Sequence, residues 1–272
     1  MPHWALLAIC VVVPLVAVLL ASREVRAWIR GTGSIRQTLS NAGVGAVFLL
    51  TQLLLRGALV GAFAGAAALV PYKLPQDAPW AWVLAFVLLD FVYYVQHRSE
   101  HAVPLLWAIH AVHHQSRDYN LSVSFRVGAL ASLSTMVFHL SLALAGVSAS
   151  MYAAVVTVHA VLLFALHART KLTFGPGRFF NAPVFHRVHH GAESAYVDKN
   201  FGGVLLVFDR LFGTFAPYTQ DPTYGVIGER DVADHGPVSA NVAPFEALLA
   251  AVRRQPTLRR KLTVLFVRER AR

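Results

Sequence analysis

Eight of the thirteen histidines in this chain fall in three short clusters whose spacing is suited to metal binding. The clusters are HRSEH at 97–101, HAVHH at 110–114 and HRVHH at 186–190. Residues three or four apart lie on the same face of a helix, so each cluster is predicted to direct its imidazoles toward one point. Neutral imidazole is a ligand for zinc, copper, iron and nickel, so the pattern indicates a transition-metal site.

A ninth histidine, His167, ends an apolar segment that is predicted to reach the same side of a membrane as the three clusters. One metal ion rarely takes more than roughly four to six protein ligands, so nine converging histidines suggest two metals. His139 and His159 are isolated within apolar segments and are predicted to bond to a neighbouring helix. The predicted metal ligands are His97, His101, His110, His113, His114, His167, His186, His189 and His190.

The composition excludes an ordinary soluble domain. Hydrophobic residues make up 56% of the chain and charged residues only 14%, well below the charged fraction of soluble proteins. The net charge is +10, but the charges lie between and after apolar runs, so we expect no nucleic-acid partner. The single cysteine, Cys10, can form neither an internal disulfide nor a thiolate metal site by itself.

Five apolar segments are candidates for spanning helices, which need about 20 mostly apolar residues. They are 4–21, 42–66, 80–96, 128–147 and 150–168, with a tight turn near 146–150. Basic residues follow the first segment, the opposite of a secretory signal, so we interpret it as a membrane helix. The expected fold is an all-α polytopic membrane protein with about four or five transmembrane helices and a cytoplasmic helical cap that carries the histidines.

The distribution of basic residues predicts the orientation. If the loop at 22–41 is cytoplasmic, five spans place 97–127 and everything after 168 on the same side, with 22 of the 24 Lys and Arg residues. The histidines then lie at the cytoplasmic face of what is predicted to be a bacterial inner membrane. We expect one membrane domain over 1–272 that ends in a cytoplasmic basic tail at 219–272.

The histidine segments and their neighbours resemble the fatty acid hydroxylase/sterol desaturase family of membrane di-iron enzymes. The resemblance rests on DFVYYVQHRSEH at 90–101, HAVHHQSRDYNLSVSFR at 110–126 and NAPVFHRVHHGAESAYVDKNFGGVLLVFDRLFGTF at 181–215. It covers roughly 85–218, the predicted catalytic core, and is closest in detail to the branch that resembles alkylglycerol monooxygenase. It implies that the nine histidines hold two iron ions.

The family resemblance also implies O₂-dependent oxidation of C–H bonds in a membrane lipid or sterol-like substrate. A separate electron-transfer protein or reductase would act as the external electron donor. Hydroxylation is favoured by the resemblance to a monooxygenase branch, and desaturation by the same centre is the alternative. Outside this class, a membrane metal transporter and a b-type cytochrome remain alternatives. Both fit the pattern less well, because the histidines lie at helix ends and occur in adjacent pairs.

Metal-bound imidazoles usually donate their second N–H to a carboxylate or a carbonyl, which orients the ring. Carboxylates and amides near the histidines are therefore predicted to support the ligands or to cap turns, with Asp209 a further possibility. Arg117 and Arg126 are predicted to anchor the chain at the membrane interface. The predicted supporting residues are Asp90, Glu100, Asp118, Asn181, Asp198 and Asn200.

Overall fold

The computed structural model describes residues 22–23, 25–173, 177, 179–226 and 236–267. Within these ranges the chain consists of helices and loops, with two isolated β-bridges, Phe180–Leu205 and Gly191–Tyr224. The all-α fold class is therefore confirmed. The helices are α2 Ile35–Ala68, α3 Pro79–Ala102, α4 Pro104–His114, the 3₁₀ helix η1 Leu121–Phe125, α5 Ala131–Leu144, α6 Ala149–Leu166, α7 Pro183–His189, α8 Val207–Leu211, α9 Pro237–Arg253 and α10 Leu258–Phe266.

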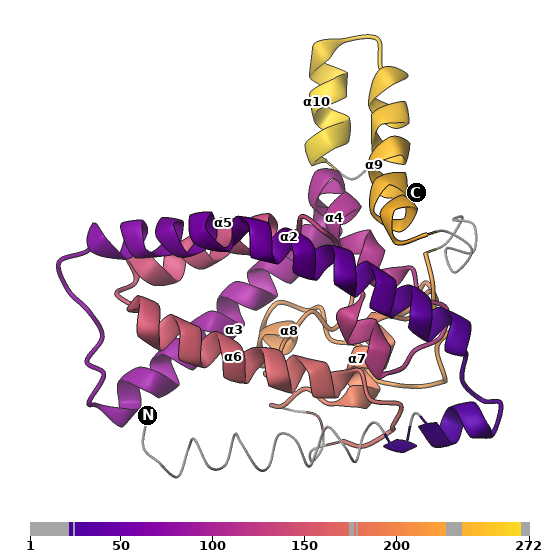
Figure 1. Ribbon diagram of the computed structural model, residues 1–272, viewed down its shortest axis with the longest axis horizontal. Coiled ribbons are helices and arrows are strands. Elements are labelled where there is room, and N and C mark those ends of the chain that lie inside the picture. Colours follow the sequence, from indigo (N-terminus) through magenta and orange to yellow (C-terminus); the bar gives the residue numbers. More distant parts are fainter. Residues whose placement is uncertain (1–21, 24, 174–176, 178, 227–235, 268–272) are drawn as a thin grey trace.

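Four apolar helices, α2, α3, α5 and α6, run side by side and return the chain from one end of the bundle to the other (Figure 1). Of the helices in the described ranges, α2, α3 and α6 have the length and apolar composition to cross a membrane. They confirm the predicted segments 42–66, 80–96 and 150–168. The predicted segment 128–147 forms the shorter α5, whose 14 residues extend about 21 Å, less than the roughly 30 Å thickness of a bilayer core. The predicted segment 4–21 lies outside the described residues.

Local sequence signals set the helix boundaries near the histidines. Only Val103 separates the end of α3 from Pro104, which begins α4, so the chain bends sharply between the first two histidine clusters. Pro183 begins α7 in the same way. At the opposite end of the bundle, the Ser148 hydroxyl accepts from the backbone N–H of Met151 and caps α6. The bundle therefore returns every histidine-bearing segment to one end.

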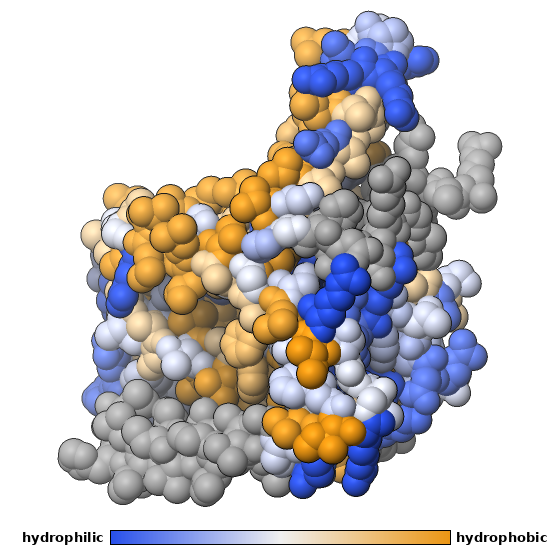
Figure 2. Space-filling model, turned by 45° about the vertical axis from the view of Figure 1, so that its right-hand side comes forward, coloured by the Kyte–Doolittle hydropathy of each residue, from blue (hydrophilic) through white to orange (hydrophobic). Residues whose placement is uncertain are grey.

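Small residues let the spanning helices approach one another at the end remote from the histidines. Ala81 and Ala85 of α3 are fully buried in a core that also contains Leu142 of α5 and Met151 of α6. Hydrophobic side chains also cover the outside of the bundle, as expected for a lipid-facing surface (Figure 2). The protein is thus a polytopic membrane protein.

A buried carboxylate ties the loop after α7 to the spanning helices. Asp90 of α3 is fully buried and accepts from His159 of α6 at 2.7 Å. It also accepts the backbone N–H groups of Val204 at 2.7 Å and Leu205 at 2.9 Å. A side chain at Gly203 would place a Cβ only 2.5 Å from the Asp90 Oδ1, so the loop needs glycine there. His159 is thus bonded to a neighbouring helix, as predicted.

The predicted basic tail contains a helical hairpin. Helix α9 packs against α4 and α2, and α10 folds back along α9 so that the pair projects from the bundle (Figure 1). The tip of the projection is hydrophilic (Figure 2) and includes the exposed Arg253, Arg254, Arg259 and Arg260. The C-terminal part of the chain is therefore anchored to the bundle by α9.

Replacing Asp90 with alanine should destabilise the protein, because the buried His159 ring and the backbone N–H groups of Val204 and Leu205 would lose their acceptor. We expect Asp90→Ala to reduce the free energy of unfolding by about 3 kcal/mol, the usual cost of breaking a buried pair. Thermal unfolding in detergent measures this change. Asp77→Ala, in the exposed loop before α3, is the matched control and should leave the midpoint unchanged. Equal midpoints for both variants would contradict the bracing role of Asp90.

Candidate metal centre

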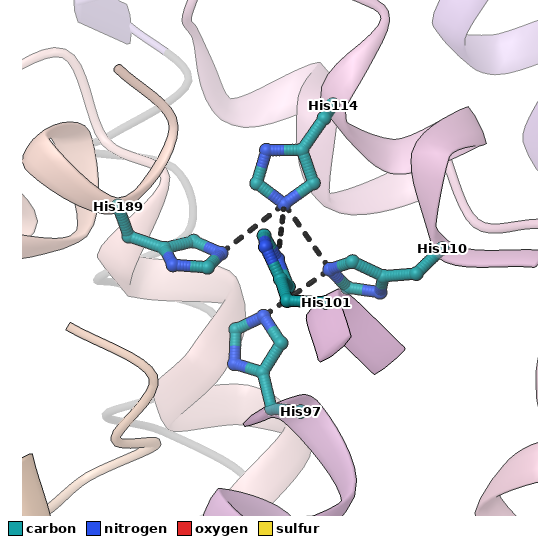
Figure 3. Close-up of side chains that lie close together, drawn as sticks. All are labelled: His97, His101, His110, His114 and His189. Atoms are coloured by element: carbon teal, nitrogen blue, oxygen red, sulfur yellow. Dashed lines mark hydrogen bonds between the residues drawn. The ribbon is translucent and has the colours of Figure 1, made fainter. Parts of the chain in front are cut away.

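Five histidines from three helices converge on one point at the end of the bundle (Figure 3). Each contributes one ring nitrogen, and these nitrogens all lie within 4.8 Å of one another. The Nε2 of His114 is 3.2 Å from that of His101 and 3.1 Å from those of His110 and His189. We name this group the five-histidine cluster; its members are His97, His101, His110, His114 and His189.

The other four histidines converge on a second point beside the first. The Nε2 of His167 is 3.2 Å from that of His113 and 3.1 Å from that of His186. The two clusters touch, since the rings of His114 and His190 stack with their centroids 4.4 Å apart. We name this group the four-histidine cluster; its members are His113, His167, His186 and His190.

The expectation that each sequence cluster aims at one point is wrong for the second and third. His110 and His114 join the five-histidine cluster, whereas His113 between them joins the other. In α7, His189 is likewise separated from His186 and His190. Adjacent residues of a helix point about 100° apart, so each HH pair reaches two neighbouring points.

The donor set fits two transition-metal ions. Nitrogens about 2.1 Å from one metal and at right angles to each other are about 3.0 Å apart, close to the separations seen here. At so short a distance two ring nitrogens cannot both carry protons. A neutral ring whose outer nitrogen donates to a carbonyl, as in His97, His189 and His113, directs a lone pair to the shared point. Imidazole nitrogen without thiolate suits iron, zinc or copper.

Burial keeps these imidazoles neutral, as ligands must be. Burial, followed by repulsion between neighbouring imidazoles, lowers the pKa of His113, His114 and His190 well below the ordinary value. The same causes act on His186 and His189, although a hydrogen bond to a backbone carbonyl partly opposes them for His189.

The loop at 198–205 contacts three members of the five-histidine cluster from outside. The carbonyl of Phe201 accepts from His97 Nδ1 at 2.9 Å, and that of Lys199 accepts from His189 Nδ1 at 2.9 Å. The Asp198 carboxylate lies 3.3 Å from His101 Nδ1. These contacts leave the Nε2 atoms free to face the cluster.

This loop holds an unusual backbone shape. Asp198 and Asn200 have φ values of 58° and 54°, a left-handed conformation that few non-glycine residues adopt. The Asn200 amide donates to the carbonyls of Phe185 and Ala216, and its oxygen accepts from the N–H of Ala216. These three bonds offset the local strain.

Two further side chains fix the same loop. Asp209 accepts from the N–H groups of Phe201 and Gly202, each within 2.8 Å. Asn181 donates to the carbonyls of Gly202 and Gly203. Both polar side chains are buried and act on the loop rather than on a histidine ring.

Glu100 supports the remaining edge of the five-histidine cluster. Its carboxylate lies 3.1 Å from His110 Nδ1 and also accepts from Gln96 and Ser134. The glutamate is only 4% exposed. Glu100 and Asp198 are therefore the two predicted supporting residues whose carboxylates touch a cluster histidine.

The four-histidine cluster has different outer contacts. The carbonyl of Arg126 accepts from His113 Nδ1 at 3.0 Å, and that of Leu163 from His167 Nδ1 at 3.1 Å. The buried Nδ1 of His186 and Nε2 of His190 have no hydrogen-bond partner. The Nε2 of His186 faces His167, so its unpartnered Nδ1 is an outer nitrogen that lacks an acceptor.

Two sequence interpretations are corrected by these contacts. Arg126 is only 1% exposed and donates to Val112, Asn41 and Gln115, so it braces α2 against α4 instead of anchoring the chain at a membrane interface. Asp118 bonds to the Ser34 N–H and to Arg169. Its carboxylate holds the start of α2 and does not contact a cluster histidine.

Sequence reasoning missed the backbone carbonyls and one aromatic side chain. Trp107 of α4 packs against His101 and His114, with ring centroids 5.0 and 5.6 Å apart. Its place three residues before His110 could have suggested a shared helix face. No sequence signal marks a carbonyl that accepts from a ring, because every residue carries one.

Cavities reach the histidines from two sides. One of about 370 Å³ lies among α3, α5 and α6, is lined mainly by apolar side chains such as Leu163 and Phe164, and ends at His110, His113, His167 and His186. Another of about 240 Å³ lies toward the loops and is lined by Trp107, Asp198, His101, His114, His189 and His190. We name them the bundle cavity and the loop cavity.

Acid should destabilise the metal-free protein. The histidines whose pKa burial lowers stay neutral in the folded state but take up protons near pH 6.5 when unfolded, so the unfolded chain binds more protons below that pH. They are His113, His114, His186, His189 and His190. The contribution of these neutral histidines to the free energy of unfolding is therefore fully present above about pH 6.5 and is lost as the pH falls below that value. Thermal unfolding after chelation, compared at pH 7.5 and 5.5, measures the loss. His186→Leu removes one such group and should give a shallower dependence, whereas a midpoint independent of pH would contradict the prediction.

Comparison with known proteins gives the family. Residues 82–214 match the fatty acid hydroxylase family. Over 57% of its length, the chain is 39% identical to alkylglycerol monooxygenase from Homo sapiens and from Danio rerio, and 28% identical to the ornithine lipid hydroxylase OlsE from Rhizobium tropici.

The matched part of this chain spans about a third of the length of the alkylglycerol monooxygenases (35% and 34%) and 49% of the ornithine lipid hydroxylase. No solved structure matches the chain. The matched segment contains the first two histidine clusters, His167, the third cluster and the loop at 198–205. Residues 82–214 of this protein therefore belong to the fatty acid hydroxylase family and are similar, within it, to the alkylglycerol monooxygenases.

Proposed function

We propose that this protein is an O₂-dependent di-iron hydroxylase that acts on a C–H bond of a membrane lipid. The observation that carries the proposal is the bundle cavity, which joins an apolar space between the spanning helices to histidines of both clusters. A cavity of about 370 Å³ is within the usual range for a small ligand or part of a larger one.

The five-histidine cluster would hold one iron ion and the four-histidine cluster the other. When bound, the iron pair would supply the activation of dioxygen with two external electrons. The chain's own contribution is to hold the imidazoles together in a largely buried site and to fix most of the rings through the outer nitrogen. Glu100, Asp198 and the carbonyls of Lys199 and Phe201 do this for the first cluster.

The bundle cavity would bind and orient the substrate. Leu163 and Phe164 of α6 and Ala131 of α5 offer an apolar wall for an alkyl chain, which would enter sideways from the bilayer. The same wall excludes water from the reacting carbon, a condition that protects reactive intermediates. Ile109 and Val127 extend this apolar lining toward His110 and His113.

The relatives bear on the type of reaction and substrate. One group is named for monooxygenation of alkylglycerols and another relative for hydroxylation of ornithine lipids. Both names describe oxygen insertion into lipids with a polar head and a long apolar part. We therefore favour hydroxylation over desaturation and a lipid with a headgroup over a sterol.

The loop cavity would face the electron donor, a separate electron-transfer protein or reductase. It reaches members of both clusters from the side opposite the spanning helices. We place this end of the bundle in the cytoplasm of a bacterium, because 22 of the 24 basic residues lie on its side of the predicted spans. The protein would form one membrane domain whose catalytic core is 85–218.

Lipid extracts from a strain with and without the gene test the proposal directly. In the strain with the gene we expect a lipid whose mass increases by one oxygen atom. When the culture is grown under ¹⁸O₂, this added oxygen should be ¹⁸O. Loss of two hydrogens instead would identify a desaturase. An unchanged lipid profile together with metal uptake by proteoliposomes would support a transporter, and a Soret band would support a cytochrome.

Removing one ligand from either cluster should abolish the reaction. We expect His189→Ala in the first cluster and His113→Ala in the second to eliminate product while the protein still inserts into the membrane. His139→Gln controls for the loss of a buried histidine, because His139 bonds to Tyr152 and lies outside both clusters. Full activity in either ligand variant would contradict the assignment.

Narrowing the bundle cavity should block substrate without removing metal. Ala160 of α6 lines this cavity, so we expect Ala160→Phe to reduce product formation at least about tenfold, as a filled pocket loses its substrate interactions. The metal content should stay unchanged. Ala153→Phe, two turns away on the same helix and also exposed, is the matched control and should retain activity. Equal activity of the two variants would show that substrate does not use this cavity.

A further inference from the structure

The two histidine clusters differ in the charge of the groups that contact them. Glu100 lies 3.1 Å from His110 Nδ1 and Asp198 lies 3.3 Å from His101 Nδ1, so two carboxylates border the five-histidine cluster. Glu100 is almost fully buried, whereas the side chain of Asp198 is 47% exposed. Glu100 therefore provides the less screened of the two negative charges.

The four-histidine cluster has only neutral outer contacts in the part of the chain that the structure describes. Backbone carbonyls accept from His113 and His167, and the buried Nδ1 of His186 has no acceptor. In the described residues no carboxylate contacts an outer nitrogen of this cluster. Its surroundings therefore lack the negative charge that favours a cation at the five-histidine cluster.

These differences all favour tighter metal binding by the five-histidine cluster. A carboxylate that accepts from the outer N–H of an imidazole increases the basicity of the nitrogen that faces the metal. A negative charge close to a buried dication also lowers its electrostatic energy. One cluster offers five nitrogens and the other four, so the number of donors adds to the same imbalance.

We propose that the two metal positions bind with unequal affinity and fill in a fixed order. The five-histidine cluster binds the first ion tightly, and the four-histidine cluster binds the second more weakly and exchanges it more readily. The proposal rests on the proposed function only in that both clusters hold metal. Three members of the four-histidine cluster, His113, His167 and His186, line the bundle cavity, whereas only His110 of the other cluster does, so more of the weaker position faces the substrate.

Titration of the chelator-treated protein in detergent with Co²⁺ tests the order. Visible absorption and the bound metal per chain are recorded together. We expect two steps whose dissociation constants differ by at least about tenfold, consistent with the effect of outer ligands on affinity. A single step of two ions, or tighter binding of the second ion, would overturn the proposal.

Ligand variants assign the steps. His189→Ala should weaken the tight step and leave the weak one unchanged, and His186→Ala should weaken or remove the weak step and leave the tight one unchanged. The reverse assignment would overturn the proposal. Because each variant is compared by stoichiometry, the result does not depend on turnover.

Carboxylate variants test the cause. We expect Glu100→Gln to weaken the first step by about 10- to 100-fold and to leave the second unchanged. Asp198→Asn, at a half-exposed position, should weaken the first step less than Glu100→Gln does. It provides a second test if Glu100→Gln does not fold. Asp118→Asn is the matched control, because Asp118 contacts Ser34 and Arg169 and no cluster histidine. Equal effects of these variants on both steps would show that the carboxylates do not create the difference.

The lipid assay separates this inference from the proposed function. A protein that hydroxylates lipid but binds two equivalent Co²⁺ ions would refute the inference alone. A protein that binds two ions in the expected order but produces no oxidised lipid would refute the proposed function alone.

Discussion

Nine imidazoles lie together at one end of the bundle, seven of them buried and two half-buried, and the rest of the structure must hold them there. Their ring nitrogens approach to 3.1–3.2 Å, a distance at which inward lone pairs repel unless a cation lies between them. Most of the rings are therefore held by the other nitrogen, although the outer nitrogen of His186 has no acceptor. The groups that accept from those outer nitrogens are as much a part of the site as the rings are.

The loop at 198–205 is the main source of that support. It brings two carbonyls and one carboxylate to three rings and keeps a left-handed backbone at Asp198 and Asn200. Such a shape persists only where surrounding bonds enforce it, and here Asp90, Asn181 and Asp209 do so. Asp90 belongs to a spanning helix, so the fold of the membrane part and the geometry of the site are linked.

The position of the site suits the proposed chemistry on lipids. The spanning helices end where the histidines begin, and the bundle cavity connects the two. A substrate that stays in the bilayer could thus present a carbon of its apolar part without being extracted into water. The loop cavity leaves the opposite side for electrons. The proposed inequality of the metal positions would place the more exchangeable ion on the substrate side.

The sequence by itself determined the class of the protein and the identity of the nine converging histidines, because apolar runs and helical spacing are local properties that survive in any all-α bundle. It also indicated Glu100 and Asp198 through their nearness to the histidines. Only the tertiary structure decided how His113 separates from His114 and His189 from His190, that Arg126 is a buried brace and that Asp118 acts elsewhere. Those outcomes depend on contacts between segments up to about a hundred residues apart, such as Phe201 with His97, and on backbone carbonyls that no residue type reveals.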